Sequence, residues 1–129
     1  AMDCGHLLDI DTIEIIGFLP KESLETDSNA SFFASLKKHE HHFQKLYKDA
    51  EDNGCKLKYV AQFEEGKAKV GLQKIPGGHD FYNLEGSDNI VLFFTERYPN
   101  QPLIIKGAGA GADVTASGIF ADIIRIGNF

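Results

Sequence analysis

The sequence predicts an α+β fold, with a mostly antiparallel sheet and two main helices packed on one face of it. Three observations predict this class: a helical repeat of apolar residues between 29 and 53, a series of strand-like segments between 56 and 106, and an amphipathic segment near the carboxyl end. The resulting order is strand, helix, four strands, helix. Four consecutive strands favour an antiparallel sheet over alternating strand and helix units.

Composition is that of one ordinary globular domain. The chain has 129 residues, 43% hydrophobic and 25% charged. The formal net charge of −6 disfavours a nucleic-acid partner, because such a partner needs a basic face on the protein.

Cys4 and Cys55 are far apart and lack a CxxC pattern, so we expect reduced thiols. No apolar run approaches the roughly 20 residues that span a bilayer, and residues 1–6 lack a targeting pattern, so we expect a soluble cytoplasmic protein without a membrane partner.

The first half of the chain predicts one strand and one long helix. Residues 11–18 are β-branched and alternate loosely, so they predict a strand that ends before Pro20. A polar loop follows, in which Ser28 or Asn29 can cap a helix. The helix is indicated by one stripe at spacings of three and four residues, formed by Phe32, Leu36, His39, Phe43, Leu46 and Ala50. Asn53-Gly54 is a natural left-handed end for it.

The next segment predicts a hairpin with one solvated face. Residues 56–63 and 67–75 alternate, and the turn 64–66 joins them. On the first strand Leu57, Tyr59, Ala61 and Phe63 point to one side, with Val60 as the exception.

The last third predicts two strands and a helix. Residues 89–96 are apolar on both faces, as expected of a central strand, and residues 102–106 form the next strand. A helix that starts near Asp113 or Thr115 carries the apolar residues Val114, Ile119, Phe120, Ile123, Ile124 and Ile126.

The glycine-rich segment between this strand and helix is the strongest functional signal. Residues 107–112, "GAGAGA", fit the pattern G-x-G-x-x-A of dinucleotide-binding loops. That fingerprint also needs a further strand and an acidic residue about 20 positions later, for which no residues remain before Phe129. Asp113 would moreover occupy the helix amino terminus that a diphosphate requires. The loop could instead bring backbone against a neutral part of a cofactor or another protein segment, or serve only as a tight crossover.

Other candidate sites are weaker. His39 and His42 in "HEHH" could share an ion, but His39 belongs to the apolar stripe, so we expect one half-buried histidine, two surface histidines and no metal. The acidic residues at 49–52 and 64–65 lie at a helix end and a turn. Ser23 and Ser117 lack a G-x-S-x-G setting. No catalytic residue is therefore assigned to this chain.

Residues 86–126, "GSDNIVLFFTERYPNQPLIIKGAGAGADVTASGIFADIIRI", resemble the carboxyl end of homoserine dehydrogenase. The matching pattern is G-x-x-N before an apolar strand, a second strand, and then G-x-G-A-G-x-x-V-T-A-x-G followed by a helix. The hairpin and the preceding helix also fit the order of that family, so the resemblance covers essentially the whole chain. "DVTASG" and "GIFADIIR" are most similar to the dehydrogenase half of the bacterial bifunctional aspartokinase–homoserine dehydrogenases.

This resemblance implies a division of the chain. Residues 1–106 would be the carboxyl-terminal part of a catalytic and dimerisation domain, and residues 107–129 would complete the Rossmann domain of the parent enzyme. The glycine loop would then lie beside the nicotinamide end of NADP or NAD. Gly111 would place its backbone beside the cofactor, Gly109 would permit the close approach, and Thr115 would be a weaker contact.

The implied activity is the NAD(P)-dependent interconversion of L-homoserine and L-aspartate 4-semialdehyde, in threonine, methionine and isoleucine biosynthesis. The family's catalytic lysine, its substrate-binding acidic residues, its monovalent-cation site and the residues that select NAD or NADP would all lie upstream. Ala1-Met2 suggests an engineered start, so we expect an excised portion that is inactive alone. Its expected partners are the rest of the parent enzyme, a second subunit in a homodimer, and homoserine. The alternative is a small amino-acid-binding regulatory module, although such modules alternate β-α-β-β-α-β.

Overall fold

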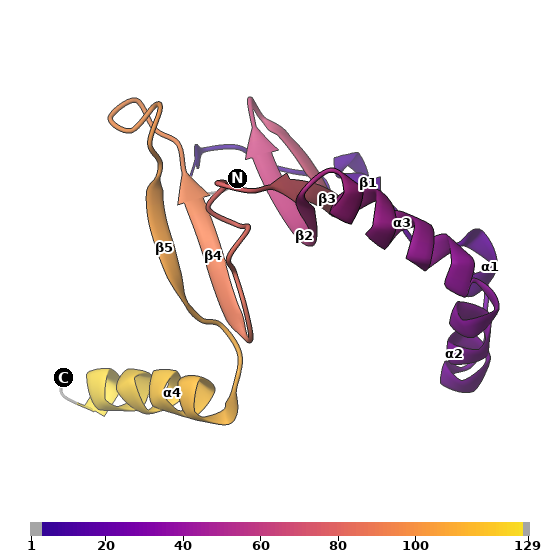
Figure 1. Cartoon of the computed structure of the whole chain (residues 1–129). Coiled ribbons are helices and arrows are strands. Elements are labelled where there is room, and N and C mark those ends of the chain that lie inside the picture. The colour runs from indigo at the N-terminus through magenta and orange to yellow at the C-terminus, as the bar shows by residue number, and fades with distance from the viewer. Residues whose placement is uncertain (1–3, 128–129) are drawn as a thin grey trace. The chain divides into compact units, whose positions relative to one another are not determined.

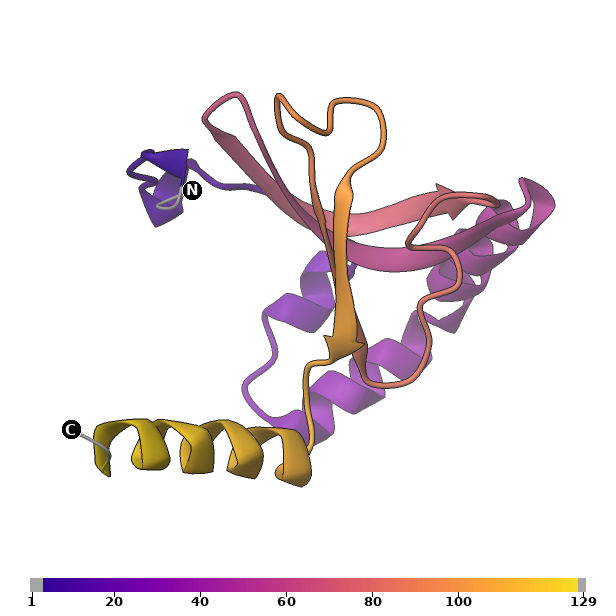
Figure 2. The same ribbon diagram turned by 90° about the vertical axis from the view of Figure 1, so that its left-hand side faces the viewer.

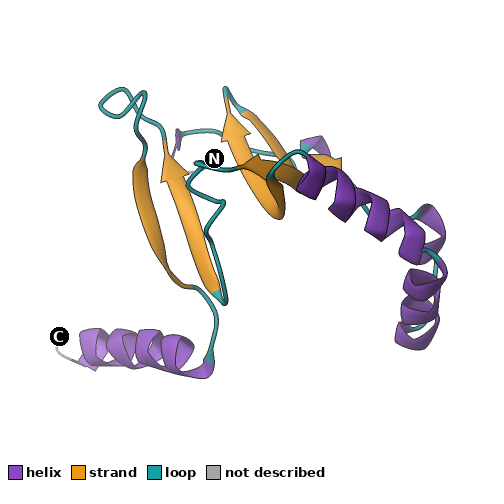
Figure 3. Ribbon diagram, viewed as in Figure 1, coloured by secondary structure: helices purple, strands orange, loops and turns teal. Residues whose placement is uncertain are grey.

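The structure is a computed structural model and describes residues 4–127. The class expected from the sequence is confirmed, since helices accompany mostly antiparallel strands (Figures 1 and 3). The chain divides into two compact units, Ala1–Tyr82 and Asn83–Phe129, which are described separately. Expectations that concern Ala1-Met2 and residues 128–129 lie outside the described residues. The elements in order are a 3-10 turn η2 (Ile10–Thr12), β1 (Glu14–Ile16), α1 (Lys21–Leu24), α2 (Asn29–Lys38), α3 (Glu40–Asp52), β2 (Cys55–Glu64), β3 (Lys67–Pro76), β4 (Asp88–Phe93), β5 (Leu103–Ala108) and α4 (Ala112–Gly127).

The first unit is built on the predicted hairpin. β2 and β3 pair in antiparallel register from Cys55 opposite Pro76 to Glu64 opposite Lys67. The two turn residues are left-handed, with φ of 49° at Glu65 and 76° at Gly66, which is the backbone of a tight two-residue hairpin turn. The hairpin expected from the alternation is thus confirmed. β1 adds to the other edge of β3 in parallel.

The buried face of this hairpin differs from the expectation. Val60, the exception in the sequence pattern, is the buried residue of β2, and Tyr59 is 59% exposed. Val60 lies opposite Gly71 of β3, and Gly71 pairs with Ile16 of β1. Gly71 has no side chain, so Ile16 closes over it; a Cβ at Gly71 would lie 2.5 Å from the Ile16 Cβ. Alternation alone could not reveal this packing.

The expected long helix is two helices. Ser28 caps α2 through a capping box with Ser31, and α2 ends at Lys38 with His39 as its carboxyl-terminal cap. The imidazole Nδ1 of His39 lies 2.9 Å from the Ser35 carbonyl oxygen, and the chain turns there before α3 begins. The apolar stripe is still the least exposed side of both helices, with Ala50 2% exposed.

Two smaller elements correct the expectation for residues 11–29. The strand is shorter than predicted, because η2 occupies Ile10–Thr12 and β1 only Glu14–Ile16. The polar loop contains the short helix α1. Its Ser23 is 1% exposed and shares a 2.8 Å hydrogen bond with the Ser35 hydroxyl of α2.

The contact between α1 and α2 also includes an ion pair. The Lys38 ammonium donates to the Glu22 carboxylate at 2.9 Å, and His39 lies 3.5 Å from the same oxygen. The hydrogen bond and charge of Lys38, with a smaller contribution from His39, hold the pKa of Glu22 below its ordinary value of 4.5.

A cation–aromatic contact joins the start of β2 to the last residue of the unit. The Lys56 ammonium lies 4.5 Å from the centre of the Tyr82 ring.

The second unit is a two-stranded antiparallel ladder followed by a helix. β4 and β5 pair from Asp88 opposite Ala108 to Phe93 opposite Leu103. β4 was expected to be a central strand, but within residues 4–127 it pairs with β5 alone. All six residues of β5 are exposed. A two-stranded ladder is only marginally stable by itself, and within the described part of this unit no further strand joins it.

α4 is one uninterrupted helix, drawn in yellow in Figure 2. It begins at Ala112, one residue before the earlier of its two expected starts. Every residue from Ala112 to Gly127 is exposed, including Phe120 at 64% and Ile123 at 59%. None of the helices between residues 4 and 127 combines the length and apolarity needed to cross a membrane.

Candidate functional site

The glycine-rich segment is partly a strand. Gly107 and Ala108 belong to β5, where Gly107 lies opposite Asn89. The ladder extends one residue further, because the Gly109 N–H donates to the Ser87 carbonyl oxygen at 3.3 Å. The turn into α4 is therefore only three residues long, from Gly109 to Gly111.

The three glycines meet different physical requirements. Gly111 has φ of 134°, a conformation that residues with a Cβ rarely adopt. Gly109 has no such φ, but a Cβ there would overlap the Asn89 side chain and lie 2.5 Å from its Cγ. A Cβ at Gly107 would meet nothing within 4 Å. Gly109 is thus required by a neighbouring side chain, and Gly111 by the backbone itself.

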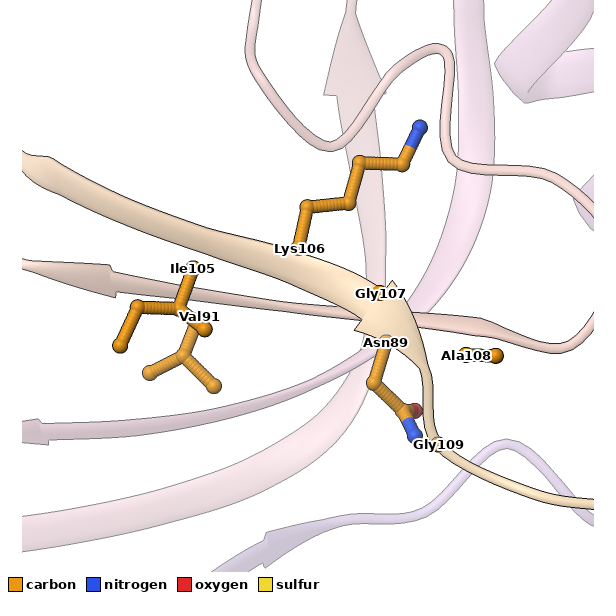
Figure 4. A pocket seen from close by; sticks show the side chains of 7 residues that line it. All are labelled: Asn89, Val91, Ile105, Lys106, Gly107, Ala108 and Gly109. Carbon is orange, nitrogen blue, oxygen red and sulfur yellow. The ribbon is translucent and has the colours of Figure 1, made fainter. Parts of the chain in front are cut away.

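A shallow groove lies along this end of the ladder (Figure 4). It is lined by Asn89, Val91, Ile105, Lys106, Gly107, Ala108 and Gly109. The Asn89 side chain points toward Gly109, and Val91 and Ile105 lie on the same side of the strands. This follows from the two-residue repeat, which also puts Gly107 and Gly109 on that face.

The opposite face of the ladder carries Ile90, Leu92 and Ile104, with one ion pair at this end. The Lys106 side chain points away from Asn89 and its ammonium lies 3.6 Å from the Asp88 carboxylate. The groove itself therefore offers two aliphatic side chains, open glycine backbone and one neutral carboxamide. Such a lining suits a flat, uncharged group that can exchange hydrogen bonds with an amide.

Of the residues expected at the site, only Gly109 lines this groove. Gly111 and Thr115 follow it, and the Thr115 N–H donates to the Gly111 carbonyl oxygen at 3.1 Å as α4 begins. Asp113 lies in the first turn of α4, where its charge complements the helix dipole. A cofactor contact at Gly109, Gly111 or Thr115 stays a prediction.

Asn89 is the residue to which sequence reasoning gave no role. The signal was present in the G-x-x-N pattern before β4, but its meaning depends on the strand register. That register puts Asn89 opposite Gly107 of β5, close to Gly109 just beyond the end of the strand. A pattern of residue types does not show which strand lies opposite, so the sequence could not supply this contact.

The histidine cluster has structural partners. His39 is half-buried and His41 and His42 are exposed, as expected. The imidazole Nε2 of His42 lies 2.8 Å from the Phe18 carbonyl oxygen. Within residues 4–127, no three His, Cys, Asp or Glu side chains gather where one metal ion could bind them.

Comparison with known proteins decides the family. Residues 3–124 match the family model described as homoserine dehydrogenase. The chain belongs to the homoserine dehydrogenase family. The resemblance expected from the sequence is thereby confirmed over essentially the whole chain.

Curated relatives of this homoserine dehydrogenase-family chain include fused and unfused enzymes. It is 38% identical over 128 residues to the chloroplastic bifunctional aspartokinase/homoserine dehydrogenase 1 of Arabidopsis thaliana, covering 98% of the chain and 14% of that protein. It is 38% identical over 118 residues to the homoserine dehydrogenase of Paracoccidioides brasiliensis, covering 90% of the chain and 32% of that protein. The chain thus spans only part of these relatives. The plant relatives are named as chloroplastic, and a cytoplasmic location for this chain stays a prediction.

A solved structure gives the same fold. The crystal structure of a Candida auris protein of unknown function aligns with a TM-score of 0.78 and 41% identity, covering 92% of this chain and 33% of that one. At this identity the agreement supports homology as well as a shared architecture.

Proposed function

We propose that this chain is the carboxyl-terminal part of a homoserine dehydrogenase, an oxidoreductase that interconverts L-homoserine and L-aspartate 4-semialdehyde with NADP or NAD. The observation that carries the proposal is the family match over residues 3–124, which includes the glycine turn and its groove. Residues 1–106 would contribute to the catalytic and dimerisation domain, and residues 107–129 would complete the nucleotide-binding domain. The alternative, an amino-acid-binding module, is favoured by no feature of residues 4–127.

The residues at the glycine turn fit a nicotinamide ring. Gly107 leaves the backbone of β5 open on the face that carries the groove, whereas the Asn89 side chain occupies the space at Gly109. Val91 and Ile105 supply aliphatic contact for a ring face. When bound, the cofactor supplies hydride exchange with the carbon that bears the hydroxyl group. Gly109, Gly111 and Thr115 would hold and orient the ring and keep water from it.

No residue of this chain is proposed to transfer a proton. In the proposed parent enzyme the catalytic lysine, the substrate carboxylates and the monovalent-cation site lie upstream. This chain would shape one wall of the pocket. We therefore expect the chain alone to reduce no NADP when homoserine and potassium are supplied.

The exposed apolar residues support a larger assembly. Monomeric proteins rarely leave large contiguous apolar patches uncovered. Ile119, Phe120 and Ile123 on α4 are each more than half exposed, and Leu103 to Ile105 on β5 are each 43% exposed or more. We assign the α4 residues to contact with the nucleotide-binding domain, and the face of the β4–β5 ladder opposite the groove to the homodimer.

A chimera tests the proposed function. This chain would replace the matching segment of the P. brasiliensis relative, to which it is 38% identical over 118 residues. We expect homoserine-dependent formation of reduced nicotinamide, measured by its absorbance. A Gly111→Val chimera should lose cofactor binding, because φ at Gly111 is 134°.

The control is the unaltered fungal enzyme under the same conditions. A chimera that is folded and dimeric but shows neither turnover nor cofactor binding, while the fungal enzyme is active, would contradict the proposal.

A further inference from the structure

We propose that Asn89 recognises the carboxamide of the nicotinamide ring, by hydrogen bonds from its own side-chain amide. This inference rests on the proposed function, because it assumes that a nicotinamide cofactor lies at the groove. It adds a cofactor-contacting residue on β4, whereas the predicted contacts all lie in the glycine turn and α4.

The strand register and Gly109 set the position of the Asn89 side chain. Asn89 pairs with Gly107, and its side chain points along the strands to Gly109. It is therefore flanked by two residues without side chains. Gly109 has an ordinary φ, and a Cβ there would collide with the Asn89 amide. The glycine at 109 thus preserves space for this particular side chain.

The Asn89 side chain has unused hydrogen-bonding capacity. The residue is exposed, and its side chain makes no hydrogen bond to any described residue. A primary carboxamide carries a donor group and an acceptor oxygen side by side. It can therefore pair with a second primary carboxamide through two hydrogen bonds at once.

The surroundings of the Asn89 side chain in the groove are apolar and uncharged. Val91 and Ile105 line the groove beside Asn89, and they suit the face of a flat ring. The one cation at this end of the ladder, Lys106, points to the opposite face and is paired with Asp88. The groove thus favours a neutral carboxamide over a carboxylate.

The first test uses the complete 129-residue chain. The chain is labelled with nitrogen-15 and titrated with nicotinamide mononucleotide, and NMR records the Asn89 side-chain amide and the Gly107 and Gly109 backbone amides. We expect saturable shifts of these signals. Nicotinic acid mononucleotide, which has a carboxylate in place of the carboxamide, should bind about tenfold more weakly, the usual effect of losing one or two hydrogen bonds.

Two variants complete this test. Asn89→Leu has nearly the same size and cannot form hydrogen bonds, so it should remove the preference for the carboxamide ligand. Asn100→Leu is the matched control, because it makes the same chemical change at an exposed loop position outside the groove. Equal affinity of the two ligands for the unaltered chain, or an unchanged preference in Asn89→Leu, would overturn the inference.

A second test separates this inference from the proposed function. In the chimera, the dissociation constants of NADP and of its 3-acetylpyridine analogue, which lacks the amide nitrogen, are compared with and without Asn89→Leu. We expect the unaltered chimera to prefer NADP by about tenfold and the variant to bind both alike. An active chimera whose preference survives Asn89→Leu refutes the role of Asn89 and leaves the proposed function standing. An inactive chimera that binds neither cofactor refutes the proposed function, while the titration of the chain still decides the role of Asn89.

Discussion

At the scale of single residues, the glycine-rich segment shows that a motif can combine unrelated requirements. Gly111 is needed for its left-handed backbone, Gly109 for the space that Asn89 occupies, and Gly107 for neither reason within the described residues. The sequence pattern treats the three as equivalent. Their substitution should therefore have distinct consequences.

Gly111→Ala should destabilise the turn into α4. A residue with a Cβ is strained at φ of 134°, and strain of this kind costs about 1–3 kcal/mol. Amide hydrogen exchange at the first turn of α4, including Thr115, would report it as faster exchange. Gly107→Ala is the matched control, because a Cβ at 107 meets nothing within 4 Å. Equal exchange rates in the two variants would show that the turn is not held in this conformation.

The ionisation of Glu22 gives a second prediction at this scale. Its pKa is lowered in the folded chain, chiefly by the hydrogen bond and charge of Lys38 and less by His39. A lowered carboxyl pKa means that the stabilisation is present above the unfolded value and is lost as pH falls through the lowered folded value. Lys38→Ala should therefore move the pKa of Glu22 back toward 4.5, as followed by carbon-13 NMR of its carboxyl group. Lys37→Ala removes the neighbouring positive charge as a control, and the same shift in both variants would rule out a specific pair.

At the scale of elements, the first unit depends on how β1 joins the hairpin. β1 is only three residues long, and it pairs in parallel with β3 through Ile16 and Gly71. Gly71 permits this close approach of Ile16, and it lies opposite the buried Val60 on the neighbouring strand. One small residue thus lies at the centre of a row that crosses three strands.

Gly71→Ala should therefore weaken the first unit. The added Cβ would lie 2.5 Å from the Ile16 carbonyl oxygen, so β1 must move away. Overpacking of this kind costs about 1–3 kcal/mol. Urea unfolding should show a lower midpoint, and the Ile16 amide should exchange faster. Gly77→Ala, where a Cβ has open space, serves as the control. Equal midpoints for the two variants would contradict this account of the sheet.

Local patterns predicted several elements well. The alternation on either side of Glu64–Gly66 predicted the β2–β3 hairpin, and Ser28 and Asn53-Gly54 correctly marked helix ends. The break at His39 was missed because the residue fits the apolar stripe, whereas its imidazole lies beside the Ser35 carbonyl oxygen. The burial of Val60 and the contact between Asn89 and Gly109 were missed for another reason. Both depend on which residue lies opposite in a neighbouring strand, and strand register is not encoded in a single segment.

At the scale of the whole molecule, the two units differ in how much of their apolar surface is covered. The first unit buries Ala50, Val60 and Ile75, whereas no residue of β5 or α4 is buried. The family relatives are several times longer, and the chain accounts for 14% of the Arabidopsis enzyme and 32% of the fungal one. We infer that the second unit has its stabilising contacts with parts of a larger protein.

The exposed face of α4 provides a test of this inference. Phe120→Asp in the chimera should lower the midpoint of thermal unfolding, because a charge would be placed where an aromatic side chain is proposed to be buried, a change that costs several kcal/mol. Lys37→Asp, a charge change on exposed α2, is the comparison and should have little effect. A chimera as stable with Phe120→Asp as without it would show that α4 remains in solvent.

The contact between Lys56 and Tyr82 has a practical consequence for shortening the gene. The Tyr82 ring lies against the Lys56 ammonium, near the start of β2. Tyr82 is the last residue of the first unit and comes six positions after Pro76, where β3 ends. A gene fragment that ends with codon 76 would lack Tyr82 and the segment that leads to it. Expression of the amino-terminal portion by itself should accordingly keep codon 82 and place the stop no earlier than codon 83.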